Sequence, residues 1–332
     1  MPALAARVRA SRGVAHKQDI AGVVQRLGNA APGAKLAVPM GDDCAALCDP
    51  SGSGYLLFAI EGFVNDFVAA EPWFAGYCGV MVNVSDIYAM GGRPTAVVDA
   101  LWARDGAPGD AILDGLAAAS RVYGVPIVGG HSNRRCDREQ LSVSIIGRAL
   151  RLLSSFAARP GQHLLAAIDL RGHFHEPFPY WDASSGSPAE RLRGDLEILP
   201  ILAEAGLCGA AKDISMAGIV GTALMFAECS GVGVSIDVAA IPRPAGVALS
   251  RWLEIFPSFG FLLAVDDAAL DEVRSHFETR GIATGVLGRF DTSRRVHLTR
   301  DAAVAEVWNF AQQALIGCAV PAAPVPADGA RT

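Results

Sequence analysis

The sequence predicts a mixed α/β protein of the α+β class with two domains. Its 332 residues exceed twice the roughly 150 residues of an average domain. Short apolar strands alternate along the chain with longer segments of helical apolar periodicity. The stretch RLLSSFAARPG (151–161), rich in arginine and closed by Pro-Gly, divides this pattern in two. We therefore place the domain boundary near residue 155.

The expected N-terminal domain, residues 1–155, contains strands and helices in alternation, which pack as a sheet covered by helices. Strands are predicted at residues 55–60, 95–102 and 141–150, and helices at residues 73–90 and 110–123. The run PIVGG (126–130) has the composition of a buried strand that ends in glycines.

The expected C-terminal domain, residues 156–318, repeats this mixture. Strands are predicted at 163–168, 232–238, 260–265 and, as a pair, within 283–300, and helices at 189–205, 217–229, 268–280 and 302–315. Residues 319–332 are rich in proline and alanine and offer little apolar surface to bury, so we expect a disordered tail.

Composition argues against nucleic-acid and membrane partners. The chain has 28 Lys and Arg against 34 Asp and Glu, a net charge of −6, and no basic run. Every apolar stretch is interrupted before the ~18 residues that a membrane-spanning helix needs. Charged residues make up 19% of the chain, below the roughly 25% of ordinary globular proteins. We therefore expect part of the surface to be buried against another subunit.

Cysteine usage indicates a cytoplasmic protein. The chain has 7 cysteines, an odd number, scattered and without a C-x-x-C pair. Its first residues contain no uninterrupted apolar segment of the kind found in secretory signals. We expect reduced thiols and no disulfide framework.

The segment MGDDCAAL (40–47) is the sharpest local signal of chemistry. A glycine, Gly41, and two adjacent carboxylates, Asp42 and Asp43, precede a short apolar strand. Adjacent side chains on an extended chain point in different directions, so one carboxylate can bind a hard cation while the other fixes the loop. A solvated turn explains the same three residues without function.

The segment VNVSDIYAMGGRP (82–94) places two polar residues in an apolar helix. Asn83 and Asp86 are three positions apart and share a face, and Gly91-Gly92 ends the helix. Buried polar groups need partners, and a metal and phosphate cluster supplies them. An Asn–Asp pair that caps a neighbouring loop is the alternative.

Two further segments carry glycines beside polar residues. In PIVGGHSN (126–133), Gly129 and Gly130 at a strand end would let backbone N–H groups approach phosphate, beside His131. In AKDISMAGIVG (211–221), Asp213 precedes a helix that contains Gly218, which is either an ordinary helix start or an anion site. Neither segment is a Walker A loop or a Rossmann G-x-G-x-x-G.

Taken together, these four segments resemble one superfamily in order and spacing. It comprises aminoimidazole ribonucleotide (AIR) synthetase, thiamine-monophosphate kinase, selenophosphate synthetase and the hydrogenase maturation factor HypE. GDDCAAL is similar to its GDDAA segment, VNVSDIYAMGGRP to its N-x-S-D-x-x-A-M-G-x-x-P helix, VGGHSN to its strand-end GG motif, and DISMAGIVG to its D-x-S-x-G-G-L segment. FPSFGFLLAV (256–265) resembles its S-x-G-x-L-L strand. The resemblance covers about residues 15–300 and is strongest to the AIR synthase-related branch.

The resemblance implies a two-domain AIR-synthetase-like fold, with an N-terminal sheet that pairs across a homodimer and a C-terminal α/β sandwich. It implies an enzyme that uses ATP and Mg²⁺ to phosphorylate or activate a small molecule. By the resemblance, the metal-binding and catalytic residues would be Asp42, Asp43 and Asp86. The nucleotide-binding residues would be Gly41, Asn83, Gly129, Gly130, His131, Asp213 and Gly218.

Three positions depart from the kinase pattern. Glu61 stands in place of a T-T-D aspartate, His131 follows the GG pair, and Met216 replaces the second aspartate of D-x-S-D-G. These departures argue against thiamine monophosphate as the substrate. They also leave a second hypothesis, in which the chain is a nucleotide-binding but catalytically idle subunit of a multi-enzyme assembly. The cysteine or selenocysteine of selenophosphate synthetase is missing too, since residues 1–39 contain no cysteine.

Substrate specificity is expected in the second domain, in residues 174–188. This stretch is predicted to join a strand to a helix over more residues than the usual 2–6, and long connections are commonly binding loops. Tyr180, Trp181 and Asp182 could stack on and hydrogen-bond to a small polar molecule, with Glu61 as a fourth substrate residue. Surface packing is the alternative for these aromatic residues.

Overall fold

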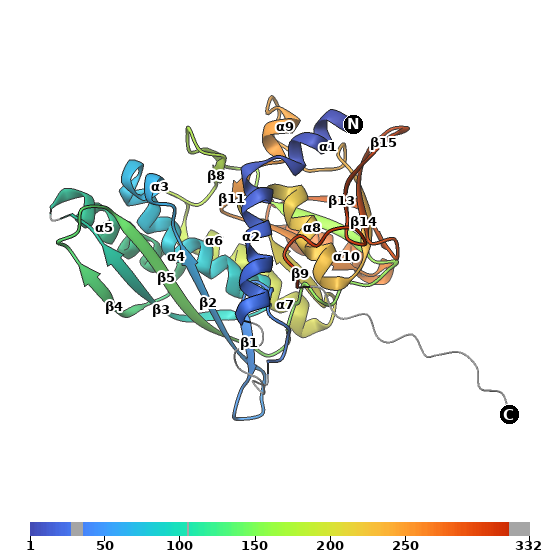
Figure 1. Ribbon diagram of the computed structural model, residues 1–332. Helices are drawn as coiled ribbons and strands as arrows, with labels where there is room; N and C mark the ends of the chain where they lie inside the picture. The colour runs from blue at the N-terminus through green and yellow to red at the C-terminus, as the bar shows by residue number, and fades with distance from the viewer. Residues whose placement is uncertain (28–35, 105, 319–332) are drawn as a thin grey trace.

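The computed structural model describes residues 1–27, 36–104 and 106–318. Two large sheets, each with its own helices, lie side by side, and a small three-stranded sheet accompanies them (Figure 1). The first sheet is formed by residues of the N-terminal half and the second by residues of the C-terminal half. The predicted mixed α/β architecture is confirmed.

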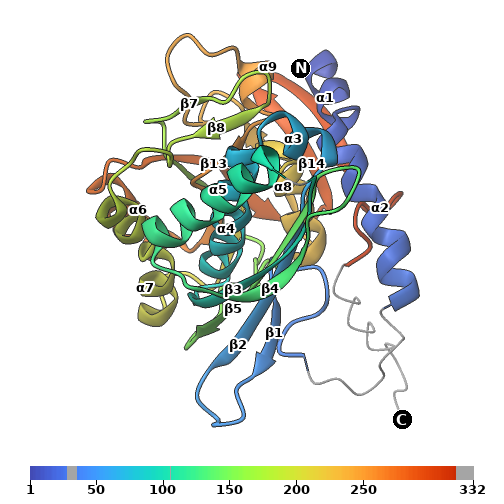
Figure 2. The same cartoon turned by 90° about the vertical axis from the view of Figure 1, so that its left-hand side faces the viewer.

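The first sheet has five strands in the order β1-β2-β5-β3-β4. The strands are β1 (Ala45–Cys48), β2 (Tyr55–Gly62), β3 (Arg93–Trp102), β4 (Ile127–Asn133) and β5 (Gln140–Ala149). Its helices are α3 (Asn65–Ala70), α4 (Pro72–Ala89) and α5 (Ala107–Tyr123), and Figure 2 shows them gathered on one side of the sheet. None of these three helices covers the opposite face of the sheet (Figure 2).

Helix α4 is buried along nearly its whole length. It packs against β2, β3 and β5 on one side and against α5 on another, and it also contacts β9 and α7 of the second half. A helix that is apolar all round must be covered all round, and this explains the residues from Phe74 to Val84. Asp86 therefore lies on an element that both halves enclose.

The second sheet has seven strands in the order β15-β14-β10-β13-β6-β12-β9. They are β6 (His163–Ile168), β9 (Ala210–Asp213), β10 (Gly233–Asp237), β12 (Gly260–Val265), β13 (Ala283–Asp291), β14 (Arg295–Arg300) and β15 (Ala303–Asn309). Its helices are α6 (Ala189–Leu196), α7 (Ile198–Ala205), α8 (Gly218–Ser230), α9 (Leu249–Trp252), the short η1 (Asp267–Ala269) and α10 (Leu270–Glu278). The N-terminal helices α1 (Pro2–Arg9) and α2 (Arg12–Leu27) contact β15 and α8 of this half.

The structure corrects the predicted helix at 302–315. Residues 303–309 instead form β15, which pairs antiparallel with β14 from Arg300–Ala303 to Arg295–Asn309. The exposure along β15 runs from exposed to buried and does not alternate, so the period-two signal of a strand is missing. Asp301, at a φ of +53°, makes the tight turn that sends the chain back along β14.

The predicted helix at 189–205 divides into α6 and α7 at Glu197. Pro200 lies in the first turn of α7, where its missing N–H leaves no helical hydrogen bond unmade. The domain boundary near residue 155 stays a prediction, and the predicted tail at 319–332 lies outside the described residues. No helix in the described part of the chain combines the length and apolar composition needed to cross a membrane.

Candidate active site between the two halves

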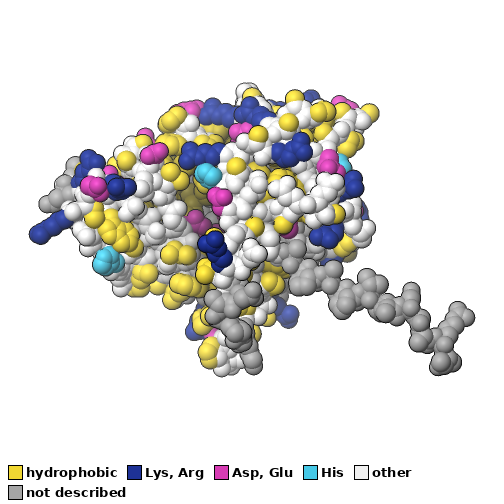
Figure 3. All heavy atoms as spheres, viewed as in Figure 1, with side chains coloured by type: hydrophobic (Ala, Val, Ile, Leu, Met, Phe, Trp, Pro, Cys, Tyr) yellow, Lys and Arg dark blue, Asp and Glu magenta, His cyan; other side chains and the backbone are white. Residues whose placement is uncertain are grey.

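A cavity of about 340 Å³ lies between the two halves of the chain. Figure 3 shows a hollow on this face, with acidic side chains beside it. Helices α2 and α4 and strand β2 line the cavity from one side. Strands β8 (Tyr180–Asp182), β9 and β11 (Phe256–Pro257) line it from the other. Of the four segments singled out in the sequence, those at 40–47, 82–94 and 211–221 contribute residues to the lining, whereas the segment at 126–133 does not.

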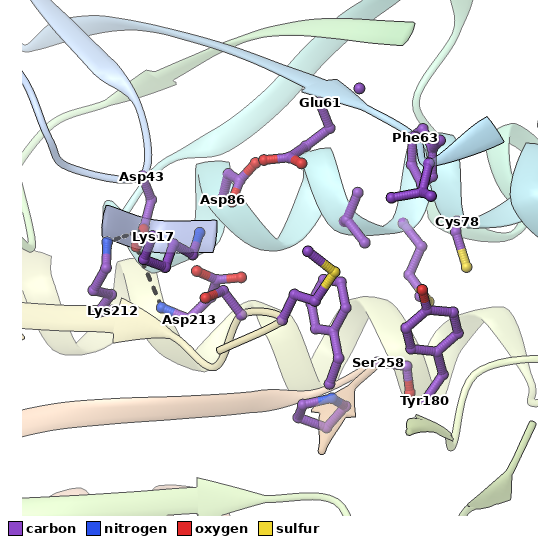
Figure 4. A pocket seen from close by; sticks show the side chains of 18 of the residues that line it. Lys17, Asp43, Glu61, Phe63, Cys78, Asp86, Tyr180, Lys212, Asp213 and Ser258 are labelled. Carbon is purple, nitrogen blue, oxygen red and sulfur yellow. Dashed lines mark hydrogen bonds and ion pairs between the residues drawn. The ribbon is translucent and has the colours of Figure 1, made fainter. Parts of the chain in front are cut away.

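Three carboxylates from different elements meet at one end of this cavity. Asp43 lies just before β1, Asp86 lies on α4, and Asp213 ends β9. One oxygen of each lies within 4.8 Å of the others. Each acid comes from an element fixed by the core around it, so the cluster is set by the packing of both halves (Figure 4).

Lys212 balances part of this negative charge. Its Nζ forms an ion pair with Oδ1 of Asp43, and the Asp213 N–H donates to Oδ2 of Asp43 at 3.3 Å. Lys212 is only 4% exposed. Burial lowers the pKa of Lys212, but the charges of Asp43 and Asp42 outweigh burial and raise that pKa above its ordinary value. The ammonium group is therefore positively charged.

The charge of Lys212 does not offset the burial and mutual repulsion of Asp86 and Asp213. Burial, and then the other acids of the cluster, raise the pKa of Asp86 and of Asp213 well above the ordinary range. Oδ2 of Asp86 is buried and accepts no hydrogen bond from the described residues. An unpartnered carboxylate oxygen among other acids fits a hard divalent cation such as Mg²⁺, which prefers oxygen ligands.

Glu61 and Lys17 face this cluster from the other walls. The carboxylate of Glu61, on β2, lies beside that of Asp86 (Figure 4). Burial raises the pKa of Glu61, and the charge of Lys17 opposes that effect. Lys17 reaches the cavity from α2. Both residues are in position to contact a molecule bound at the acids.

Asp42 lines the same cavity, but its carboxylate is engaged elsewhere. Ser154 Oγ donates to Oδ2 of Asp42 at 2.6 Å, and Ser155 Oγ donates to Oδ1 at 2.5 Å. The backbone N–H of Ser155 donates to Oδ2 at 3.1 Å. Asp42 therefore ties the acidic turn to the segment that connects the two halves. Gly41 permits this turn, because it has a φ of +121° and its Cβ would collide with Cys318.

Asn83 and Gly218 are buried away from the lining of the cavity. Asn83 Nδ2 donates to the Gly79 carbonyl within α4 at 2.8 Å. The amide group therefore bonds within its own helix, and Asn83 does not line the cavity beside Asp86. Gly218 begins α8 at a φ of +73°, where a Cβ would lie 2.2 Å from the Leu253 carbonyl oxygen. Backbone packing accounts for this glycine.

Strand β4, which carries Gly129, Gly130 and His131, is at the opposite edge of the first sheet from β1, the strand that Asp43 precedes. All three residues are exposed. None lines the cavity within one chain. The prediction that the strand ends at Gly130 is wrong, because β4 continues to Asn133 through parallel pairing with β3.

The segment with Tyr180, Trp181 and Asp182 is not a long loop. It forms β7 (His173–Phe174) and β8 (Tyr180–Asp182), which with β11 (Phe256–Pro257) make a three-stranded sheet. Trp181 is buried, and its Nε1 donates to the Asp169 carbonyl at 2.8 Å. Asp182 accepts the N–H groups of Ser184 and Ser185. All three residues line the cavity, but Tyr180 is the most open of them.

Sequence reasoning missed the role of Lys212. The signal was present, because the chain has three lysines, at positions 17, 35 and 212, and two of them line this cavity. Lys212 also follows two alanines in β9 and precedes an apolar helix, and a lysine buried in such a segment requires a charged partner. Nothing in the sequence indicated Ser154 and Ser155 as partners of Asp42.

Two parts of the chain match a described protein family. Residues 41–149 match "AIR synthase related protein, N-terminal domain", and residues 172–301 match "AIR synthase related protein, C-terminal domain". "Uncharacterized protein sll0787" of Synechocystis is 42% identical over 306 residues, which cover 92% of this chain and 94% of that protein. The chain belongs to the AIR synthase-related family.

More distant relatives have names that state an activity. Subunit PurL of phosphoribosylformylglycinamidine synthase from Acidiphilium cryptum is 26% identical to this AIR synthase-related protein, over 74% of the chain and 37% of the subunit. Among solved structures, "T. maritima PurL complexed with ADP" superposes with a TM-score of 0.70 at 19% identity, covering 95% of this chain and 53% of PurL. The chain spans 37% of the first of these PurL chains and about half of the second.

A second solved structure is similar over its whole length. "AaThiL complexed with AMPPCP and TMP" has a TM-score of 0.62 at 18% identity, covering 86% of this chain and 94% of that one. At such identity these structures show the fold. The predicted AIR-synthetase-like fold of this family member is confirmed.

Proposed function

We propose that this AIR synthase-related protein is an ATP- and Mg²⁺-dependent enzyme that transfers a phosphoryl group to a small molecule. The acidic cluster of Asp43, Asp86 and Asp213 is the observation that supports it. Phosphoryl transfer asks a protein to position groups and neutralise charge, and buried acids around an unpartnered oxygen suit a phosphate-bound cation. The solved PurL and ThiL structures, whose titles name bound nucleotides, make ATP the natural candidate.

Asp43, Asp86 and Asp213 would hold the metal ion. Bound Mg²⁺ would neutralise phosphate charge and so favour transfer. Asp42 keeps a part as the residue that anchors the acidic turn to Ser154 and Ser155. Lys17 would contact phosphate oxygens from α2, and Glu61 would accept a proton from the acceptor.

The direct test is calorimetric titration of the full chain with Mg-ATP. Asp86→Asn and Asp213→Asn should each weaken Mg-dependent ATP binding at least tenfold, about 1.4 kcal/mol. Asp114→Asn is the matched control, because Asp114 is exposed on α5 outside the cavity. Unchanged affinity in both cluster variants would remove the basis of the proposal.

The competing function is that of a nucleotide-binding subunit without catalytic activity, and Met216 is the residue that favours it. Met216 lines the cavity where the related kinase pattern carries an aspartate, so the site has one acid fewer. An idle subunit would bind Mg-ATP but release no ADP with any acceptor. Measuring ADP formation against a panel of alcohols, amines and amides separates the two functions.

We also propose a homodimer formed by the outer face of the first sheet. This face carries exposed apolar side chains, namely Phe58 (50%), Ile60 (63%), Val98 (41%), Val128 (64%) and Ile146 (46%). An apolar patch of this kind is typical of a subunit interface. Phosphate contacts by Gly129, Gly130 and His131 would then require the second subunit. Sedimentation of the wild type and of Ile60→Asp tests this, and a monomeric wild type would contradict it.

A further inference from the structure

The cavity has two chemically different ends (Figure 4). The acidic end holds Asp43, Asp86, Asp213 and Glu61. The opposite end, here called the aromatic end, is formed by both halves of the chain. Its rings are those of Phe63, Phe67, Phe74, Tyr180 and Phe256. The proposed phosphoryl chemistry uses the acidic end and leaves the occupant of the aromatic end to be identified.

None of the described residues that line the aromatic end is a cation that could receive an anionic group. Among the described residues that line the cavity, the cations are Lys17 and Lys212, and both lie at the acidic end (Figure 4). Arg12 lies outside this lining. Burial raises the pKa of Tyr180 to about 12, an effect that the charge of Arg12 opposes. A phosphate or carboxylate placed among these rings would lose its water without gaining an ion pair.

The rings are arranged to hold another ring. Phe67 meets Tyr180 edge-on at 5.0 Å between centroids, and Tyr180 meets Phe256 edge-on at 6.0 Å. Edge-to-face and offset contacts at such distances are the preferred geometry between aromatic groups. Rings that already hold each other in place lose little entropy when a flat molecule packs between them.

The polar side chains near Tyr180 at this end are Cys78, Asp182 and Ser258. The Asp182 carboxylate already accepts the N–H groups of Ser184 and Ser185. Tyr180 carries one hydroxyl, and Ser258 Oγ accepts the Ala183 N–H at 2.9 Å, which leaves its own proton free to donate. Adenine has several ring nitrogens and an amino group that would lose water here without matching partners. The aromatic end therefore suits a simple ring better than the base of ATP.

We propose that the phosphoryl acceptor is an uncharged aromatic alcohol, with its ring at the aromatic end and its hydroxyl directed to the acids. This inference rests on the proposed function. The hydroxyl oxygen would form a bond to the γ-phosphorus of ATP as the bond from that phosphorus to the bridging oxygen breaks. ADP leaves, and the hydroxyl proton passes to the Glu61 carboxylate.

Binding of two matched probes tests the inference without turnover. We would titrate the metal-free full chain with 2-phenylethanol and with phenylacetate, which share a ring and differ in charge. The alcohol should bind with millimolar affinity, about −4 kcal/mol, and at least tenfold more tightly than the acid. Equal or tighter binding of phenylacetate, or no binding of either probe, overturns the inference.

A variant with an added cation should shift the preference between the two probes. Val64 lines the cavity and is 39% exposed, so Val64→Lys can place a cation there without filling the core. This variant should shift the preference at least tenfold toward phenylacetate. Val23→Lys, on α2 and outside the lining, is the control and should leave the preference unchanged. If Val64→Lys does not fold, Phe63→Arg serves the same purpose, and a preference unmoved by the added cation counts against the inference.

Two further binding experiments distinguish an acceptor site from repulsion by the acidic cluster and from an adenine site. In Asp213→Asn the preference for the alcohol should persist, whereas its loss would trace the preference to repulsion by the acidic cluster. Mg-AMPPCP should bind together with 2-phenylethanol, whereas mutual exclusion would assign the aromatic end to adenine. Failure of Mg-AMPPCP to bind at all would refute the proposed function, while a failed probe preference would refute the acceptor class alone.

Discussion

Lys212 forms an ion pair with Asp43 across 169 positions of the sequence. Lys212 belongs to the strand β9 of the second half, whereas Asp43 precedes the first strand of the other sheet. Both side chains are 5% exposed, so the pair is buried as well as long-range. It places a positive charge behind the acidic cluster and connects the two halves at the cavity.

Removing the lysine should destabilise the protein strongly. Lys212→Met leaves Asp43 buried without its counter-charge, and breaking a buried pair from one side typically costs about 3–5 kcal/mol. Urea denaturation of the metal-free protein measures the loss. Adding Asp43→Asn to this variant should restore part of the stability, and the half-buried Lys17→Met should cost less than about 1 kcal/mol. A double variant no better than Lys212→Met would show that the pair is not the cause.

Asp42 and Asp213 should respond differently to substitution. Asp42→Asn weakens the hydrogen bonds from Ser154 and Ser155, and hydrogen bonds to charged groups are worth about 1.5–3 kcal/mol each. Its main effect should therefore be on the free energy of unfolding. Asp213→Asn should instead lower Mg²⁺ affinity with little loss of stability. Calorimetry and thermal unfolding of both variants compare the two effects, and a larger loss of Mg²⁺ affinity in Asp42→Asn would restore Asp42 as the ligand.

The metal-free protein should lose stability as pH rises. Asp86 and Asp213 have pKa values raised by burial, so the folded state holds their protons more tightly than the unfolded state. Their stabilising contribution is complete below the ordinary Asp pKa of about 3.9 and is lost as pH rises through the raised values. Melting temperatures in a chelator should fall over this range, and Mg²⁺ should flatten the fall. The same slope in Asp86→Asn would exclude these acids as its origin.

Two glycine substitutions should change the free energy of unfolding in opposite directions. Gly41→Ala forces a side chain into a φ of +121° and against Cys318, so we expect a loss of about 1–3 kcal/mol and a displaced acidic turn. Gly22 lies inside α2 with open space around it, and Gly22→Ala should stabilise the protein by about 0.5–1 kcal/mol. Chemical denaturation of both variants gives the comparison, and an unchanged Gly41→Ala would mean that the turn relaxes freely.

Most elements of the fold could be predicted from periodicity. Strong patterns gave α4 and β12 nearly to the residue, because helices and strands that pack against one core carry a regular apolar spacing. The strand β15 was missed because its burial is set by where it lies along the sheet and not by alternation. Tertiary pairing with β14 decides its conformation.

The site was predictable only in part. Asp43, Asp86 and Asp213 stood out as acids in otherwise apolar segments, and the structure brings them together. Asp42 and Asp43 are neighbours in the sequence, and nothing local shows which of them turns toward Ser155 and which toward Lys212. For His131 the strand order decides, since β4 lies at the sheet edge away from the acids.

The position of α4 between the two halves has a consequence for engineering this chain. Asp86 on α4 completes a set whose other members come from β9 and from the turn before β1, so neither half contains the whole set. Exchanging one half for that of a homologue would pair acids and apolar surfaces that had not evolved together. Chimeras joined near residue 155 should therefore keep their fold more readily than their metal affinity, unless α4 and β9 are inherited from the same parent.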